Sequence, residues 1–248
     1  MNEIDLLGVR VDSVSLDEAV ARVGALVDGT RFGHVVTANV DFLHQASCDA
    51  RLRRILKRAD LVVADGVPLL WMARWQGTPL PERVNGTDLA IRLCEIAAER
   101  EWRVSLVGGE PGVAARAAAA IKSRWHLDVF GVRSPTRSAM DDPRAAAEVA
   151  DWVRASGTML LLLAMGGGRQ EHWIDRHRDR LGPCVAMGVG SALDFIAGTR
   201  RRAPEFLQRR GLEWAWRLSY EPGRLWHRYL VDDPRVLAQF ALDRLVRA

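Results

Sequence analysis

The chain is poor in cysteine and has no long hydrophobic run. Its three cysteines, Cys48, Cys94 and Cys184, are isolated and widely spaced, so they form neither a disulfide framework nor a Cys-x-x-Cys metal or redox pair. The longest apolar run, residues 158–165, is too short to span a bilayer, and the first residues lack the basic and apolar regions of a signal peptide. We therefore expect a cytoplasmic protein without a membrane span.

Motifs that hold metals and dinucleotides are also missing. The sequence has no Asp-x-Asp pair to carry a divalent metal on a sugar-nucleotide diphosphate, no Walker A loop and no Gly-x-Gly-x-x-Gly fingerprint. His172, Asp175 and His177 could form a metal cluster, but their spacing favours a solvated helix face. We expect chemistry that uses no metal and no organic cofactor, and we give little weight to an NAD(P) oxidoreductase.

The positive charge is concentrated at the C-terminal end. The whole chain has 35 Lys and Arg against 31 Asp and Glu, a formal charge of +4. From residue 199 onward, eleven arginines against six acidic residues give +5, which leaves −1 for residues 1–198. A basic segment on a nearly neutral body indicates a polyanionic partner, either anionic lipid or nucleic acid.

The first 198 residues alternate short apolar runs with longer amphipathic stretches. The apolar runs are residues 33–39, 59–65, 102–109, 158–166 and 183–190. The amphipathic stretches between them include 87–101, 111–125 and 142–156. Apolar strands separated by helices predict a Rossmann-like α/β fold, a mostly parallel sheet with helices on both faces. At the front, residues 8–27 predict a strand and a helix that Ser15 and Glu18 start as a capping box.

The pattern changes after residue 198, where no run resembles a strand. Breaks are expected at Pro204, Gly211, Pro222 and Pro234, which gives three or four short helices. We therefore predict an α/β domain over residues 1–198 and a helical appendage over 199–248.

Aromatic residues are interleaved with the arginines of the appendage. They are Trp214, Trp216, Tyr220, Trp226 and Tyr229. Exposed rings among arginines are costly without a partner. The combination suits a membrane interface, with rings at headgroup depth, or a groove for single-stranded nucleic acid. We favour the membrane and expect no nucleic acid.

The residues at the ends of the apolar runs are polar or glycine. They are Thr37, Asn39, Asp65, Gly66, Gly108, Gly109, Gly166, Gly167, Gly168, Gly188 and Gly190. Ligands of an open parallel sheet bind outside the carboxyl ends of the strands, and glycine turns at helix N-termini suit phosphate groups. One such turn alone could equally be a tight turn. Several together predict a nucleotide or diphosphate site.

Asp65 stands at the end of one of these runs, directly before Gly66 and near Pro68. One interpretation is a turn residue that caps the next helix. The other is a general base that removes a proton from an acceptor hydroxyl. Asp88 and Asp194 compete for that role, although each better fits a first-turn helix residue or cap.

The ordered motifs resemble the WecG/TagA/CpsF family, also called glycosyltransferase family 26, over roughly residues 5–235. They are TANVDFL (37–43), ADLVVADGVPLLW (59–71), ERVNGTDL (82–89), VSLVGGEPGVA (104–114), LLLAMGGGRQEHWI (161–174) and the segment 189–230. The resemblance implies a bacterial enzyme of exopolysaccharide, teichoic acid or common-antigen synthesis. Such an enzyme moves a hexose from a UDP-sugar to a polyprenyl-diphosphate-linked sugar and inverts it to a β-glycoside. N-acetylmannosamine, its uronic acid and glucose all fit as the hexose.

The resemblance also assigns roles to residues. Asp65 matches the catalytic base, with Thr37 and Asn39 beside it, while Arg83 and Gln170 match polar positions that contact the donor or the acceptor diphosphate. The appendage would dock on the inner face of the plasma membrane and close over the site. We nominate its Arg217, Arg224 and Arg228 as diphosphate ligands, because their spacing places them on one face if Pro222 only bends the helix. A homo-oligomer is compatible with this picture.

One position departs from the family pattern. Gly168 stands where related sequences often have proline, so we expect a looser turn before Arg169 and Gln170. The alternative to an enzyme is a non-catalytic module that binds nucleotide or nucleic acid through the same glycine turns and basic tail.

Overall fold

A computed structural model describes residues 3–247, without the side chains of residues 224, 246 and 247. Its centre is a sheet of six parallel strands in the order β4-β3-β8-β7-β5-β6. The strands are β3 (Gly33–Ala38), β4 (Leu61–Ala64), β5 (Val104–Gly108), β6 (Gly131–Arg133), β7 (Leu160–Ala164) and β8 (Val185–Gly188). The predicted α/β class is confirmed. Strand β6, an edge strand of three residues, was not predicted, because no apolar run marks it in the sequence.

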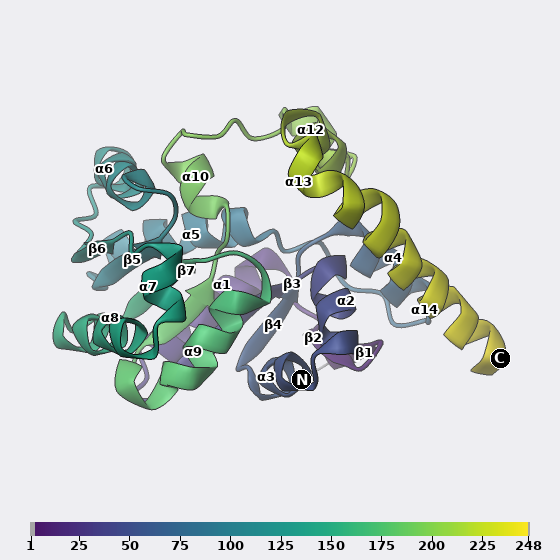
Figure 1. Cartoon of the computed structure of the whole chain (residues 1–248), viewed down its shortest axis with the longest axis horizontal. Coiled ribbons are helices and arrows are strands. Elements are labelled where there is room, and N and C mark those ends of the chain that lie inside the picture. Colours follow the sequence, from purple (N-terminus) through teal and green to yellow (C-terminus); the bar gives the residue numbers. More distant parts are fainter. Residues whose placement is uncertain (1–2, 248) are drawn as a thin grey trace.

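Helices cover both faces of the sheet (Figure 1). One face carries α1 (Leu16–Val27), α5 (Gly86–Glu99), α6 (Val113–Trp125) and α10 (Ala192–Ile196). The other carries α2 (Val40–Cys48), α3 (Ala50–Arg58), α8 (Pro143–Ala155) and α9 (Gly167–Leu181). Leu160 and Leu162 pack toward the first face, whereas Leu161 and Leu163 pack toward the second. Because successive strand residues point to opposite faces, a sheet buried on both sides needs such continuous apolar runs.

A small hairpin precedes the sheet. Strands β1 (Glu3–Leu6) and β2 (Val9–Asp12) pair antiparallel, so the first predicted strand exists but lies outside the parallel sheet. The carboxylate of Asp12 accepts a 2.8 Å hydrogen bond from the Val62 N–H and thereby ties the hairpin to the edge strand β4. The Ser15–Glu18 capping box at the start of α1 is confirmed.

The segment after residue 198 is helical among its described residues. It contains α11 (Glu205–Arg209), α12 (Glu213–Tyr220), α13 (Pro222–His227), the π-helical segment η1 (Arg228–Asp232) and α14 (Asp233–Arg247). The predicted break at Pro234 is wrong, because η1 joins α13 to α14 in one continuous helix. In its wider turn the Asp233 N–H donates to the Arg228 carbonyl, and the helix continues through Pro234, the second residue of α14.

Glu221 separates α12 from α13. Its backbone is not helical (φ −130°, ψ 54°), so Pro222 starts a new helix instead of bending an old one. The expectation that Arg217 and Arg228 share one face of a bent helix is therefore wrong. The α14 end of the long helix runs beside α4 (Val67–Trp75) (Figure 1). There Phe240 packs edge-on against Trp75, with 5.9 Å between ring centroids.

Candidate active site

Two cavities adjoin at the carboxyl ends of the parallel strands. The larger, about 610 Å³, is lined by residues that follow β3, β4, β5, β7 and β8, together with residues of the appendage. Predicted site residues that line it are Thr37, Asn39, Asp65, Gly108, Gly109, Gly167, Gln170, Gly190, Arg217 and Arg228. Arg83 lines the smaller cavity, Gly188 lines neither, and the side chain of Arg224 lies outside the described part of the structure.

Glycine is required sterically at the β5 turn. Gly108 has φ +104°, and a Cβ there would lie 2.1 Å from the carbonyl oxygen of Ala164 on the neighbouring strand. No other residue could adopt this turn without moving β7. Gly108 and Gly109 thus bring bare backbone to the wall of the cavity, where a ligand can approach it closely.

The N-terminus of α9 also faces the larger cavity. Gly166, the residue before the helix, provides no side-chain cap, so the first N–H groups of α9 are available to an anion. The Gly168 N–H is an exception, because it donates to Gln45 Oε1 at 3.1 Å. A proline at this position could not make this hydrogen bond, which ties the turn to α2, and the looser turn stays a prediction.

Gly188 serves packing instead of ligand binding. A Cβ there would lie 2.2 Å from Gln170 Nε2 and 2.3 Å from Glu171 Oε1, so only glycine lets α9 pack against β8. Glu171 is fully buried and bonds His34 Nε2 at 2.5 Å. Gln170 in turn accepts a 3.3 Å bond from the Gly190 N–H, which fixes the turn after β8 at the cavity.

Asp65 is held by the start of α5, the helix that follows the β4–α4 unit in the chain. Its carboxylate accepts from Asn85 Nδ2 at 3.0 Å and from the Gly86 N–H at 3.3 Å. The Asn85 amide cannot turn around, because its oxygen caps α5 by accepting from the Thr87 N–H at 2.9 Å. The N-cap residue of α4 is Gly66, and no side chain caps the helix, so the interpretation of Asp65 as a cap of the next helix is wrong.

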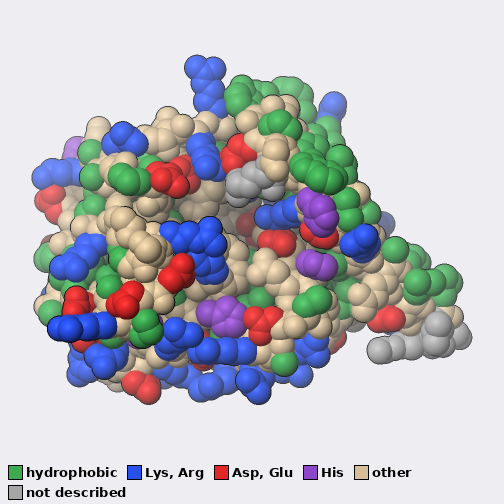
Figure 2. Space-filling model, in the orientation of Figure 1, with side chains coloured by type: hydrophobic (Ala, Val, Ile, Leu, Met, Phe, Trp, Pro, Cys, Tyr) green, Lys and Arg blue, Asp and Glu red, His purple; other side chains and the backbone are tan. Residues whose placement is uncertain are grey.

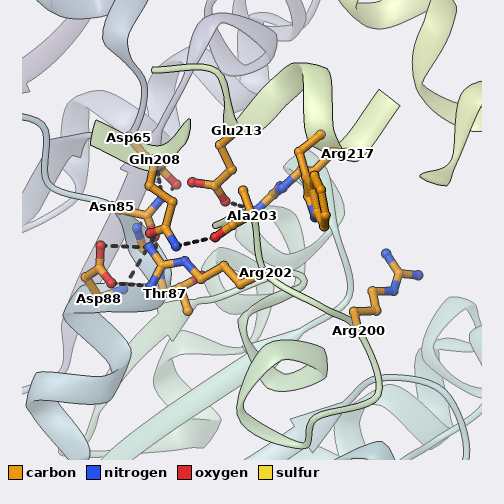
Figure 3. Close-up of polar contacts among 12 residues, drawn as sticks. Asp65, Asn85, Thr87, Asp88, Arg200, Arg202, Ala203, Gln208, Glu213 and Arg217 are labelled. Carbon is orange, nitrogen blue, oxygen red and sulfur yellow. Dashed lines mark hydrogen bonds and ion pairs between the residues drawn. The ribbon is translucent and has the colours of Figure 1, made fainter. Parts of the chain in front are cut away.

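Charged residues of the appendage surround this carboxylate (Figure 3). Glu213 accepts from Arg217 NH2 at 3.0 Å and lies 3.6 Å from Arg83 NH1. Burial raises the pKa of Asp65 above its ordinary value, the positive charge of Arg217 opposes this, and the negative charge of Glu213 reinforces it. The Gly86 N–H and Arg83 also act to lower the pKa. Asp65 is therefore a carboxylate made more basic by its surroundings.

A second ion pair anchors the segment that leads into the appendage. Arg202 meets Asp88, in the first turn of α5, with both guanidinium nitrogens, one of them at 2.9 Å. Arg202 also donates to the Asn85 oxygen at 3.4 Å (Figure 3). The prediction of Asp88 and Asp194 as first-turn helix residues is confirmed. Asn85 is thus the common neighbour of Arg202 and Asp65, which couples the appendage to the carboxylate.

The smaller cavity, about 280 Å³, lies between the body and the appendage. Apolar side chains of its wall are Val67, Pro68, Trp71, Trp214, Tyr229 and Leu237. Its polar wall contains Arg83, Asn85, Glu213 and Asp233. Asn39, Asp65, Arg217 and Arg228 line both cavities, so Asp65 stands where the polar space meets the apolar one.

The predicted cluster of His172, Asp175 and His177 on α9 makes contacts with other side chains. His172 bonds Asp49 at 2.7 Å, and Asp175 pairs with Arg51 at 3.5 Å. His177 is buried against Trp173, with ring centroids 5.0 Å apart, so a solvated face was the wrong prediction for it. Within residues 3–247, no three potential metal ligands come together in the way a metal ion would need.

Comparison with known proteins decides the family. The sequence model described as the glycosyl transferase WecG/TagA/CpsF family matches residues 4–248. The chain belongs to this family. It is also 31% identical over 219 residues to a curated protein of Bacillus spizizenii (strain ATCC 23059 / NRRL B-14472 / W23), across 88% of this chain and 82% of that one. That relative is named N-acetylglucosaminyldiphosphoundecaprenol N-acetyl-β-D-mannosaminyltransferase.

Several residues that line the two cavities were not predicted from the sequence. Glu213, Trp71 and Asp233 line the smaller cavity, while Asp41 and Arg200 line the larger one. Glu213 and Arg217 are four residues apart on a helix, a spacing typical of an ion pair, which was the one available signal. Nothing in the local sequence indicated that this pair would meet Arg83 and Asp65, because those contacts exist only after the appendage docks.

Proposed function

We propose that the chain transfers a hexose from a UDP-sugar to a polyprenyl-diphosphate-linked sugar and forms a β-glycoside. The observation that carries the proposal is the position of Asp65 between a polar and an apolar cavity. A donor nucleotide fits the polar space with its glycine turns, whereas a lipid-linked sugar fits the space lined by Trp71, Trp214 and Tyr229. The name of the Bacillus relative makes N-acetylmannosamine the first hexose to test, and diphosphate-linked N-acetylglucosamine the first acceptor.

The reaction we propose is a single displacement. The acceptor hydroxyl gives its proton to the Asp65 carboxylate while its oxygen bonds the anomeric carbon of the donor. The bond to the UDP oxygen breaks on the opposite face of the sugar, which inverts the configuration. UDP leaves as an anion that the N–H groups at the start of α9 and arginines such as Arg217 and Arg228 stabilise. We propose that these groups make a divalent metal unnecessary.

We further propose that the appendage binds the inner face of the plasma membrane. Among the described residues, twelve large hydrophobic side chains are exposed, and eight of them lie between Phe206 and Leu245. Figure 2 shows hydrophobic side chains gathered over α12 and α13. With a segment charge of +5, this surface suits anionic lipid headgroups. No helix among residues 3–247 combines the length and apolarity that crossing a membrane requires.

A donor screen tests the reaction. The purified full chain is mixed with a lipid-linked N-acetylglucosamine acceptor and UDP-N-acetylmannosamine, its uronic acid or UDP-glucose, with and without EDTA, and released UDP is measured. We expect release with one donor, undiminished by EDTA, and a β-linked product by NMR. An α-linked product would exclude the single displacement, and no release with any donor would refute the proposed transfer.

Binding assays separate the enzyme from the non-catalytic alternative. Flotation with vesicles of anionic lipid and a gel shift with single-stranded RNA are run across a range of salt. We expect the chain to float with vesicles and to leave the RNA unshifted. Salt-sensitive RNA binding without vesicle association would favour the nucleic-acid module and refute the membrane proposal.

A further inference from the structure

Glu213 is a buried carboxylate that the appendage places inside the site. The residue is 6% exposed, and one of its oxygens accepts from Arg217 at 3.0 Å. The other oxygen, Oε2, is buried without a hydrogen-bond donor among the described residues and lies 3.6 Å from Arg83. A buried carboxylate whose second oxygen has no donor is costly. Its presence therefore calls for a role beyond packing.

Stability alone does not account for such a group. Replacing a buried ion pair with apolar side chains of similar volume is often neutral or stabilising, so a helix whose task was only to dock would not need one here. Glu213 instead links two arginines of different origin. Arg83 belongs to the body, before α5, and Arg217 belongs to α12. Both line the smaller cavity beside Asp65.

The charges around Asp65 indicate what the Glu213 carboxylate does beside it. The charged groups that act on Asp65 or line the smaller cavity with it are Arg83, Arg202, Glu213, Arg217, Arg228 and Asp233, with Asp88 paired to Arg202 and Asp41 paired to Arg228. Arg217 and Arg83 lower the pKa of Asp65, whereas Glu213 raises it. Arginines that attract a diphosphate would thus weaken the base beside them. Glu213 opposes that effect.

We propose that Glu213 is a positioning residue, which holds Arg83 and Arg217 at the cavity wall and offsets their charge so that Asp65 remains able to accept a proton. The role rests on the proposed transfer reaction, in which Asp65 is the base. It explains why Glu213 stands between two arginines that would otherwise attract anions only. It also gives the appendage a chemical function, because the base is fully tuned only when α12 is docked.

The test compares Glu213→Gln, which removes the charge and keeps the shape, with Glu213→Asp, which keeps the charge. Glu148→Gln is the control, because Glu148 is an exposed partner of Arg144 on α8. Transfer by the full chain is measured from pH 5 to 9. We expect Glu213→Gln to lower the rate at pH 7 by about tenfold and to move the acidic limb to lower pH. Glu213→Asp should keep the limb in place, and the control should match the wild type.

A second readout does not depend on activity. The titration of Asp65 is followed by NMR of protein labelled with ¹³C at aspartate carboxyl groups, and Asp65→Asn identifies the resonance. The midpoint should fall in Glu213→Gln. A slower variant with an unmoved limb and midpoint would reduce Glu213 to a structural contact and overturn the proposal. If the wild type transfers no sugar but the midpoint still falls, the proposed function fails while the electrostatic role of Glu213 stands.

Discussion

Replacing Asp65 with asparagine separates its chemical role from its structural one. Asparagine has nearly the same shape as aspartate. Its oxygen can still accept the hydrogen bond that Asn85 donates to Asp65 at 3.0 Å in the wild type. Its amide nitrogen would face the Gly86 N–H in place of a 3.3 Å hydrogen bond, so one weak contact is lost. In return, a carboxylate whose pKa is raised by burial no longer needs to be buried as an anion. We expect the free energy of unfolding to change by no more than about 1 kcal/mol.

The effect on catalysis should be far larger. An amide cannot accept the proton of the acceptor hydroxyl, and a general base contributes about 10²- to 10⁴-fold to the rate. The activation free energy should therefore rise by about 3–5 kcal/mol. Binding of UDP, by contrast, should be nearly unchanged, because the glycine turns and the start of α9 are untouched.

The assay measures UDP release, UDP binding by calorimetry and thermal unfolding of the same preparations. An asparagine before Gly66 can deamidate back to aspartate, so Asp65→Ala is measured in parallel. Asp151→Asn is the matched control, because Asp151 is an exposed residue of α8 that pairs with Arg180 of α9. More than a tenth of the wild-type rate in both Asp65 variants, with stability retained, would show that another group takes the proton.

Three further predictions concern stability and membrane contact. Burial raises the pKa of Asp233 to about 6, whereas the unfolded chain has a value near 3.8, so stability falls as pH rises from about 4 to 6. At pH 8, Asp233→Asn should therefore raise the free energy of unfolding by about 1–2 kcal/mol and with it the melting temperature, whereas at pH 4 it should give no gain. An equal gain at both pH values would contradict a raised pKa of Asp233 in the folded state. Gly188→Ala should cost about 1–3 kcal/mol in chemical unfolding, because its Cβ would lie 2.2 Å from the Gln170 amide nitrogen, and an unchanged midpoint would mean that α9 can shift. Trp226→Ser should weaken flotation with anionic vesicles several-fold, whereas Phe130→Ser, at a still more exposed position on the body, should not; equal loss in both would argue against docking through the appendage.

The central sheet could be predicted because its signal is local. Five of its six strands coincide with apolar runs, and a run such as Leu160–Leu163 is continuous because both faces of the strand are buried. The missing strand, β6, has three residues and only one buried position, so no period could reveal it. Pro234 misled the prediction for a similar reason. Its effect on the helix depends on the π-helical segment before it, and no local pattern announces that segment.

The site was predictable as a set of strand ends and not as a set of contacts. The glycine turns and Asp65 follow apolar runs, and the rule that ligands bind at carboxyl ends of parallel strands gathers them. Gly188 shows the limit of that rule. It ends a strand as the others do, yet it faces the buried side chains of α9, because the twist and packing of the layers decide which turns face the cavity.

The sequence by itself therefore determined the α/β fold, the family and the edge of the sheet where the site lies, since these follow from periodicity and from ordered motifs. Only the tertiary structure showed how the Asp65 side chain is held and which charges lie near it. Its hydrogen-bond donors are Asn85 and Gly86, about twenty residues later in the chain. Two of its charged neighbours, Glu213 and Arg217, belong to α12, about 150 residues later. Burial and nearby charges set the basicity of a carboxylate, and here they come from segments that only the fold brings together.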